Sequence, residues 1–135
     1  MKEAAQTAQA TEFIDAKPEG YDSPVAQGGS NVSGGQKQRL AIARVIAKHP
    51  KVYLFDDSFS ALDYKTDAAL RKALHEQAAD ATVLIVAQRI STIMNAEQIL
   101  VLEDGKIVGK GTHEELMKTA APIRKLHARS CRKVS

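Results

Sequence analysis

The sequence predicts an α/β fold with a mostly parallel sheet. Residues 52–55 (VYLF) and 82–87 (TVLIVA) are nearly unbroken apolar runs of strand length, and such runs are typical of strands buried on both faces of a parallel sheet. Residues 64–78 lie between them and repeat their apolar positions with helical spacing. Strands that alternate with helices build a sheet of this kind, and 135 residues allow one domain with a modest core.

Before the first strand the sequence predicts two helices joined by a loop. The first helix covers residues 3–14, with Ala4, Ala8 and Phe13 on its inner face. A loop rich in proline and glycine follows over residues 17–24 and continues without periodicity to residue 30. The second helix runs from residue 34 to about residue 48, where Pro50 ends it. Its expected inner face consists of Leu40, Ala43, Ile46 and Ala47.

After the first strand the pattern continues with shorter elements. The helix over residues 64–78 is expected to bury Ala69, Leu70, Ala73, Leu74 and Ala78. A short helix at 91–95 and a third strand at 98–102 follow the second strand, and the turn 103–106 leads into a fourth strand at 107–109. Thr112 and Glu115 have the spacing of a capping box at the start of a last helix.

Composition limits the classes of protein that the chain can belong to. The apolar runs are too short to span a bilayer, which needs about 20 residues, and the start of the chain lacks the pattern of a signal peptide. A single cysteine, Cys131, excludes an internal disulfide. The net charge of +3 comes from a basic tail, residues 119–135, which has no acidic residue and no aromatic residue. We therefore expect no nucleic-acid partner.

A glycine pair at the start of the second helix is the most informative stretch. Ser33 precedes Gly34 and Gly35, and the first N–H groups of a helix can bind an anion, phosphate above all. The alternative is an ordinary N-cap by Ser33. Residues 32–36 (VSGGQ), with Gln38 and Arg39, resemble the signature motif of ABC transporter ATPases. The resemblance implies that Ser33, Gly34, Gly35 and Gln36 bind the ATP of a partner domain.

Two acids end the first strand. Ligand sites of open α/β sheets lie at the carboxyl ends of strands, where Asp56 can hold Mg²⁺ and Asp57 can orient an attacking water; a turn cap is the alternative. The pair resembles a Walker B motif with Asp56 as the magnesium residue. Most members of the family have Glu after that Asp, and Asp57 is one methylene shorter.

Two later loops resemble further motifs of the family. Residues 60–63 (SALD) are similar to the D-loop, which crosses the dimer interface in the family, although Asp63 is also placed to cap the next helix. Residues 86–92 (VAQRIST) are similar to the switch loop, with Gln88 in place of the family's His. Gln can donate a hydrogen bond to a γ-phosphate but cannot become a cation. Asp57 and Gln88 are the expected catalytic positions.

These two departures indicate a degenerate ATP site. In this family two domains pair head to tail, and each ATP lies between one domain's Walker motifs and the other's signature motif. Asp57 and Gln88 weaken the hydrolytic side of this chain's own site, whereas the signature is intact. The chain resembles the degenerate-site subunit of a heterodimeric multidrug exporter, with a different ATPase domain as its partner.

The family's phosphate-binding loop is missing from the sequence. No G-x-x-x-x-G-K-[ST] occurs in it, and no membrane domain is present. The resemblance therefore covers the C-terminal half of a P-loop ABC ATPase domain. Residues 1–33 are the expected remnant of the helical subdomain, 34–118 the half of the ATPase core, and 119–135 a tail that is either disordered or non-native.

The expected function follows from this resemblance. The parent would be an ABC exporter with ATP and Mg²⁺ as ligands and a small molecule or drug as cargo, and this chain would lie on the cytoplasmic side of the cell membrane. The chain alone is predicted to be inactive and cytoplasmic. Two alternatives remain open. One is a non-catalytic module that donates its signature motif to an intact partner. The other is a soluble ABC-type ATPase that acts on nucleic acid or the ribosome.

Overall fold

The computed structural model of the chain describes residues 1–119 and 123. The chain divides into two compact units, one from Met1 to Leu84 and one that starts at Ile85, and each is described by itself. Apart from Thr119 and Ile123, the predicted basic tail lies outside the described residues.

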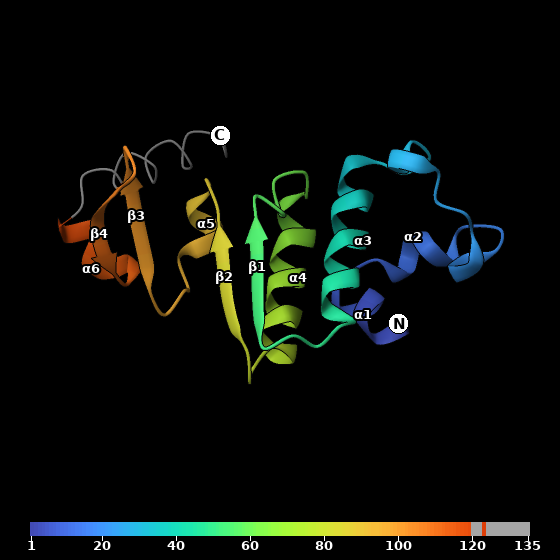
Figure 1. The fold of residues 1–135 in the computed structure, drawn as a ribbon, viewed down its shortest axis with the longest axis horizontal. Helices are drawn as coiled ribbons and strands as arrows, with labels where there is room; N and C mark the ends of the chain where they lie inside the picture. Colours follow the sequence, from blue (N-terminus) through green and yellow to red (C-terminus); the bar gives the residue numbers. More distant parts are fainter. Residues whose placement is uncertain (120–122, 124–135) are drawn as a thin grey trace. The chain divides into compact units, whose positions relative to one another are not determined.

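The first unit is an α/β arrangement, as predicted (Figure 1). Its two strands, β1 and β2, are paired and run in the same direction, with α4 as the connection between them. The end of β2 continues into the second unit. The elements in chain order are α1 (Lys2–Thr7), α2 (Thr11–Asp15), the 3₁₀ turns η1 (Gly20–Asp22) and η2 (Gln27–Gly29), α3 (Gly34–Ile46), β1 (Val52–Asp56), α4 (Tyr64–Gln77) and β2 (Thr82–Val86).

The single helix predicted for residues 3–14 is wrong, because the chain breaks between α1 and α2. Gln9 has a φ of 56°, in the left-handed region that ends a helix. Its carbonyl accepts a 2.7 Å hydrogen bond from Nη1 of Arg39 on α3. The conformation of the chain at this break is therefore stabilised by Arg39, a residue distant in sequence. Ala4 and Ala8 are buried as predicted, and Phe13 lies under the Arg39 guanidinium, 4.7 Å from ring centroid to Cζ.

The helix α3 ends at Ile46, earlier than predicted, and buries a different face. Ile42 and Ile46 are its buried residues, whereas Ala47 is exposed and Leu40 and Ala43 are half-buried. The expected face was therefore only partly right, because α1 packs against α3 and determines which side is covered. His49, with a φ of 45°, turns the chain toward β1.

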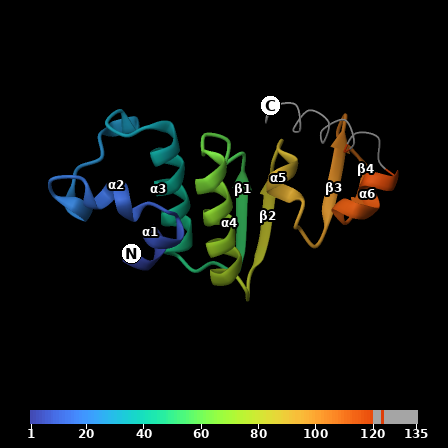
Figure 2. The same ribbon diagram turned by 180° about the vertical axis from the view of Figure 1, so that it is seen from behind.

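The buried residues of the first unit come from α1, α2, α3, β1, the turn after β1 and α4. β1 and α4 run alongside each other in Figure 1 and, seen from behind, in Figure 2. Tyr53 and Phe55 both lie on the buried face of β1 and alternate with exposed residues along the strand. The ring centroid of Phe55 lies 5.4 Å from that of Phe59. On α4, Leu70, Leu74 and the capping residue Ala78 are buried as predicted, but Ala69 is exposed.

Burial of β1 on both faces was predicted from its apolar run, and this is wrong for the described residues. Val52 and Leu54 are 61% and 62% exposed, so β1 is covered on one face only. β2 is largely exposed as well. Within the part of the chain that the structure describes, no second layer covers this apolar face.

The second unit is built on an antiparallel hairpin. Its elements are α5 (Ile90–Ile93), β3 (Ile99–Glu103), β4 (Lys106–Gly111) and α6 (His113–Thr119). β3 pairs with β4 through a two-residue turn at Asp104 and Gly105, which both have positive φ, as a type I′ turn requires. These two strands form a sheet separate from β1 and β2.

The predicted capping box of the last helix is present. Thr112 N donates to Glu115 Oε2 at 2.8 Å and Glu115 N donates to Thr112 Oγ1 at 3.4 Å. Hydrogen bonds to the Glu115 carboxylate from the backbone N–H of Thr112, which has the larger effect, and from the Thr112 side chain lower the pKa of Glu115. The core of this unit consists of Ile90, Ile99, Leu116 and Ile123. Among the described residues no helix is both long and apolar enough to cross a membrane.

Candidate functional site

The N-terminus of α3 carries the predicted signature residues. Ser33 is the N-cap, and its Oγ accepts a 3.2 Å bond from Gln36 N, while Gln36 Oε1 accepts a 3.0 Å bond from Ser33 N. The N-cap alternative for Ser33 is therefore correct as a description of the local structure. It does not exclude a ligand, because neither bond uses the hydroxyl hydrogen of Ser33 or the side-chain amide hydrogens of Gln36.

The same helix end fits an anion. Ser33 and Gly34 are exposed, the first turn of α3 has no acidic residue, and its first N–H groups have no partner within the helix. The preceding loop is held in place by Asn31, whose side chain accepts a 3.1 Å bond from Ala26 N and donates a 2.9 Å bond to Pro24 O. The hydrogen bonds of Asn31 therefore stabilise the loop that leads into the N-terminus of α3.

The two glycines differ in what surrounds them. A Cβ on Gly35 would lie 3.1 Å from the carbonyl oxygen of Ala61, whereas a Cβ on Gly34 would have only an ordinary 3.8 Å contact with Ala61 Cβ. Close packing of α3 on the turn after β1 thus favours glycine at position 35, independent of any ligand. Gly34 has room on the exposed side of the helix end.

The two acids lie at the carboxyl end of β1 as predicted, and both are exposed. Asp57 has a φ of 47°, a left-handed conformation that Asp tolerates better than most residues. Among residues 1–119 and 123, no three His, Cys, Asp or Glu side chains are grouped to hold a metal ion by themselves. Proteins usually bind Mg²⁺ through one or two carboxylates together with phosphate oxygens and water, and the role of Asp56 in such a site stays a prediction.

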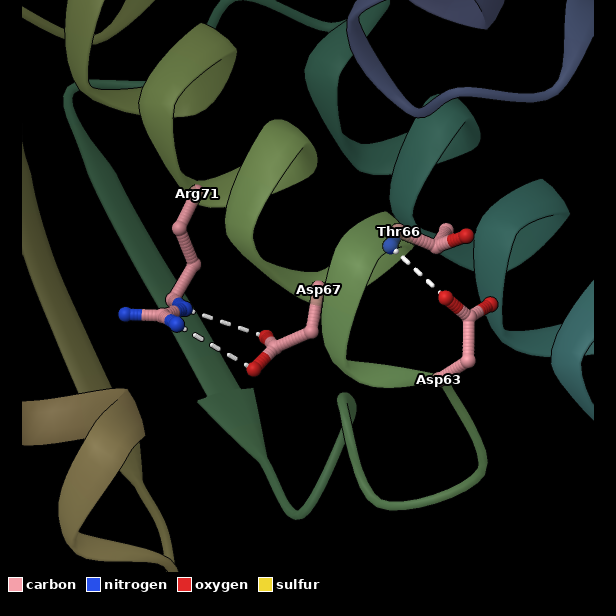
Figure 3. A network of polar contacts seen from close by, with 4 residues as sticks. All are labelled: Asp63, Thr66, Asp67 and Arg71. Carbon is pink, nitrogen blue, oxygen red and sulfur yellow. Dashed lines mark hydrogen bonds and ion pairs between the residues drawn. The ribbon is translucent and has the colours of Figure 1, made fainter.

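Asp63 is the N-cap of α4. Its Oδ1 accepts a 2.9 Å hydrogen bond from Thr66 N (Figure 3), so the predicted capping role is confirmed. Hydrogen bonds from the side chain and backbone of Thr66 lower the pKa of Asp63 below 3.8. The carboxylate is exposed at the end of the 60–63 turn, and a role of this turn at an interface stays a prediction.

The lowered pKa of Asp63 predicts a pH dependence of stability. A carboxyl whose pKa is lower in the folded state stabilises the fold above its unfolded pKa, here near 3.8, and this contribution disappears as the pH falls through the lower folded value. Asn caps a helix without ionising. We therefore expect the stability difference between the wild type and Asp63→Asn to shrink below pH 4 in urea unfolding. A difference that is constant from pH 3 to pH 6 would contradict this.

Gln88 lies between β2 and α5 in the second unit and is exposed. It precedes Arg89, the N-cap residue of α5. Its place directly after a strand agrees with the sequence interpretation, and its catalytic role stays a prediction. The same holds for Ser33, Gly34, Gly35, Gln36, Asp56 and Asp57 as ligands of ATP or Mg²⁺.

Sequence reasoning missed a buried ion pair on α4. Asp67 is 1% exposed and forms two bonds with Arg71 one turn later, Nε to Oδ1 at 3.0 Å and Nη2 to Oδ2 at 3.2 Å (Figure 3). The spacing of four residues between opposite charges is a signal that could have found the pair. Nothing local indicated that it would be buried.

Sequence reasoning also missed the tertiary roles of two residues of the signature motif. Gln38 binds the turn after β1, and Arg39 binds the carbonyl of Gln9. The two neighbours on α3 therefore fasten the helix to segments on either side of it in the sequence. Neither contact has a local signal, because the partners lie far away along the chain.

Comparisons with known proteins agree with the motifs. Residues 1–60 match the family model described as ABC transporter. The chain is 50% identical over 117 residues to an uncharacterized ABC transporter ATP-binding protein of Mycobacterium tuberculosis, covering 87% of this chain and 20% of that protein. It is 44% identical over 127 residues to the ATP-dependent lipid A-core flippase of Photobacterium profundum, covering 94% of this chain and 22% of the flippase.

A solved structure shares the fold. The bacterial Atm1-family ABC exporter with ATP bound has a TM-score of 0.89 and 38% identity over 93% of this chain, which spans 22% of the exporter chain. The chain thus spans about a fifth of the length of these relatives. By its motifs, its sequence relatives and its fold, the chain is part of the ATP-binding domain of the ABC transporter family.

Proposed function

We propose that the chain is the signature-bearing half of an ATPase domain that drives an ABC exporter. The observation that carries this proposal is the helix end at Ser33 and Gly34, which is exposed and has no acidic residue in its first turn. Asp56, the first of the two acids at the end of β1, follows 23 residues after Ser33, in the order in which the family's motifs occur. Relatives named as a flippase and an exporter favour membrane transport over the soluble alternative. The cargo would be a small molecule, a drug or a lipid.

At the partner's site, this chain would supply donors to the γ-phosphate. The hydroxyl of Ser33, the side-chain NH₂ of Gln36 and the first N–H groups of α3 are fixed before ATP arrives, because the capping box holds Ser33 and Gln36 in place. Donors that need no reorganisation stabilise charge that develops in a transition state. Gly34 would leave room for the phosphate.

At the chain's own site, Asp56 would bind Mg²⁺ together with the nucleotide. Mg²⁺ would neutralise charge on the phosphates during transfer. Asp57 would orient the attacking water and Gln88 would donate a hydrogen bond to the γ-phosphate. Both groups are weaker than the Glu and His that the family uses, since Asp57 is shorter and Gln88 stays neutral. This site would therefore hydrolyse ATP slowly. The partner, a second and different ABC domain, would carry out most of the ATP hydrolysis at its own site.

The test uses a complete ATPase domain that contains this chain, assembled with its partner domain on the transporter. Asp57→Glu combined with Gln88→His should raise hydrolysis at this chain's site by about tenfold, since a well-placed general base contributes on the order of a hundredfold or more. The partner carries a Glu→Gln change at its own Walker B position, so that single-site turnover is measured.

The control is the partner Glu→Gln change with this chain unaltered, which should leave little turnover. Near-normal turnover in that control would show that Asp57 and Gln88 are competent, and would contradict the degenerate site. No ATP-dependent turnover in the unaltered assembly would contradict the proposed function as a whole.

A further inference from the structure

One side chain connects the signature helix to the turn that follows β1. Gln38 Nε2 donates to Ser60 Oγ at 3.1 Å and to Asp57 O at 3.4 Å, and Gln38 Oε1 accepts from Ala61 N at 3.0 Å. Both ends of the side-chain amide are therefore used, by three groups of a single turn. A side-chain amide bound in this way cannot move without breaking several bonds together.

The turn that Gln38 binds begins at a residue in a left-handed conformation. Asp57, with a φ of 47°, has its carbonyl directed at Gln38 Nε2, at Ser60 Oγ (3.0 Å) and at Ser60 N (3.4 Å). A non-glycine residue keeps such a backbone only where its surroundings hold it. The direction of the Asp57 side chain therefore depends on bonds that include one from α3.

Packing connects the same two segments a second time. A Cβ on Gly35 would come within 3.1 Å of the Ala61 carbonyl, so the first turn of α3 lies directly on the turn. Phe59 and Leu62, 4% and 5% exposed, anchor the turn in the core. A shift of the α3 N-terminus must therefore shift the turn 57–61 as well.

We propose that Gln38 is a positioning residue that couples the signature end of α3 to the backbone of Asp57 and to the turn leading to Asp63. The inference rests on the proposed function, in which Ser33 binds the partner's ATP and Asp57 faces this chain's own ATP. Gln38 touches neither nucleotide in that arrangement. It transmits the position of one site to the other within a single chain.

The first arm of the test measures the contact itself, in the complete chain, by amide hydrogen exchange of Ala61 observed by NMR. Gln38→Met keeps the size of the side chain and removes its hydrogen bonds, and should accelerate exchange at Ala61 by about tenfold, the effect of losing one ordinary hydrogen bond. Gln38→Glu keeps an acceptor and should leave Ala61 protected. Arg44→Met, an exposed change on the same helix, is the control and should alter neither.

The second arm measures ATP turnover in the complete assembled transporter. Gln38→Met and Gln38→Glu should both lower kcat by about tenfold, with KM for ATP within about twofold of the wild type, because both lose the donor to Asp57 O and a small displacement of a catalytic group is costly. Arg44→Met should keep the wild-type kcat.

The outcomes separate this inference from the proposed function. Unchanged exchange at Ala61 in Gln38→Met would overturn the contact, and faster exchange with an unchanged kcat would overturn the coupling. A rise in KM with an unchanged kcat would assign Gln38 to nucleotide binding and also overturn it. A wild-type assembly without turnover would contradict the proposed function and the coupling that rests on it, while the exchange arm still decides the contact.

Discussion

Ser33→Arg is expected to lower ATP turnover of the assembled transporter by about a hundredfold, the usual cost of removing one fixed donor to a transition state. The change removes the hydroxyl that would meet the γ-phosphate and places a long cation at the N-terminus of α3. It also removes the capping bond to Gln36 N, which costs the helix about 1 kcal/mol. Turnover and folding are measured on the same sample, by phosphate release and circular dichroism.

Two further variants separate the role of the hydroxyl from that of charge. Ser33→Thr keeps a hydroxyl and a capping oxygen and should retain most of the turnover. Ala79→Arg adds the same charge at an exposed position after α4 and should have no effect. If folded Ser33→Arg turned over ATP at the wild-type rate, the proposed contact between the signature and the partner's nucleotide would be refuted.

Asp67→Ala is expected to destabilise the first unit by about 3 kcal/mol, the lower end of the range for breaking a buried ion pair. The lower end applies because Arg71 is 18% exposed and keeps some contact with water, whereas Asp67 is 1% exposed. Removal of the carboxylate takes away the acceptors of both bonds that Arg71 donates to it, from Nε and from Nη2. Urea unfolding of the complete chain measures the change.

The double variant Asp67→Leu/Arg71→Met tests the reason for this loss. Replacing both charges with apolar side chains of similar size should recover much of the stability, because the two charges of the buried pair are then removed together. Asp80→Ala, an exposed change after α4, should be nearly neutral. A double variant as unstable as Asp67→Ala would show that lost packing, rather than the removal of one charge of the pair, causes the loss.

Several helix caps and one turn could be predicted because their signals are local. Ser33 with Gln36 and Thr112 with Glu115 are capping boxes that close within three residues, and Asp63 caps α4 over the same distance. The Asp104-Gly105 turn is determined by the ease with which these two residue types adopt positive φ. The proposed ligand of Ser33 and Gln36 could not be derived in the same way, because this ATP would be bound partly by another chain.

The sequence by itself determined the order of helices and strands from α3 onward, the capped helix ends and the place of Asp56 and Asp57 after β1. Only the tertiary structure decided the break at Gln9, the burial of Asp67 and the attachment of Gln38 to the turn after β1. Capping and turn formation depend on hydrogen bonds between residues a few positions apart. Burial and long-range hydrogen bonds instead depend on which segments meet in space, and no short window of the sequence contains both partners.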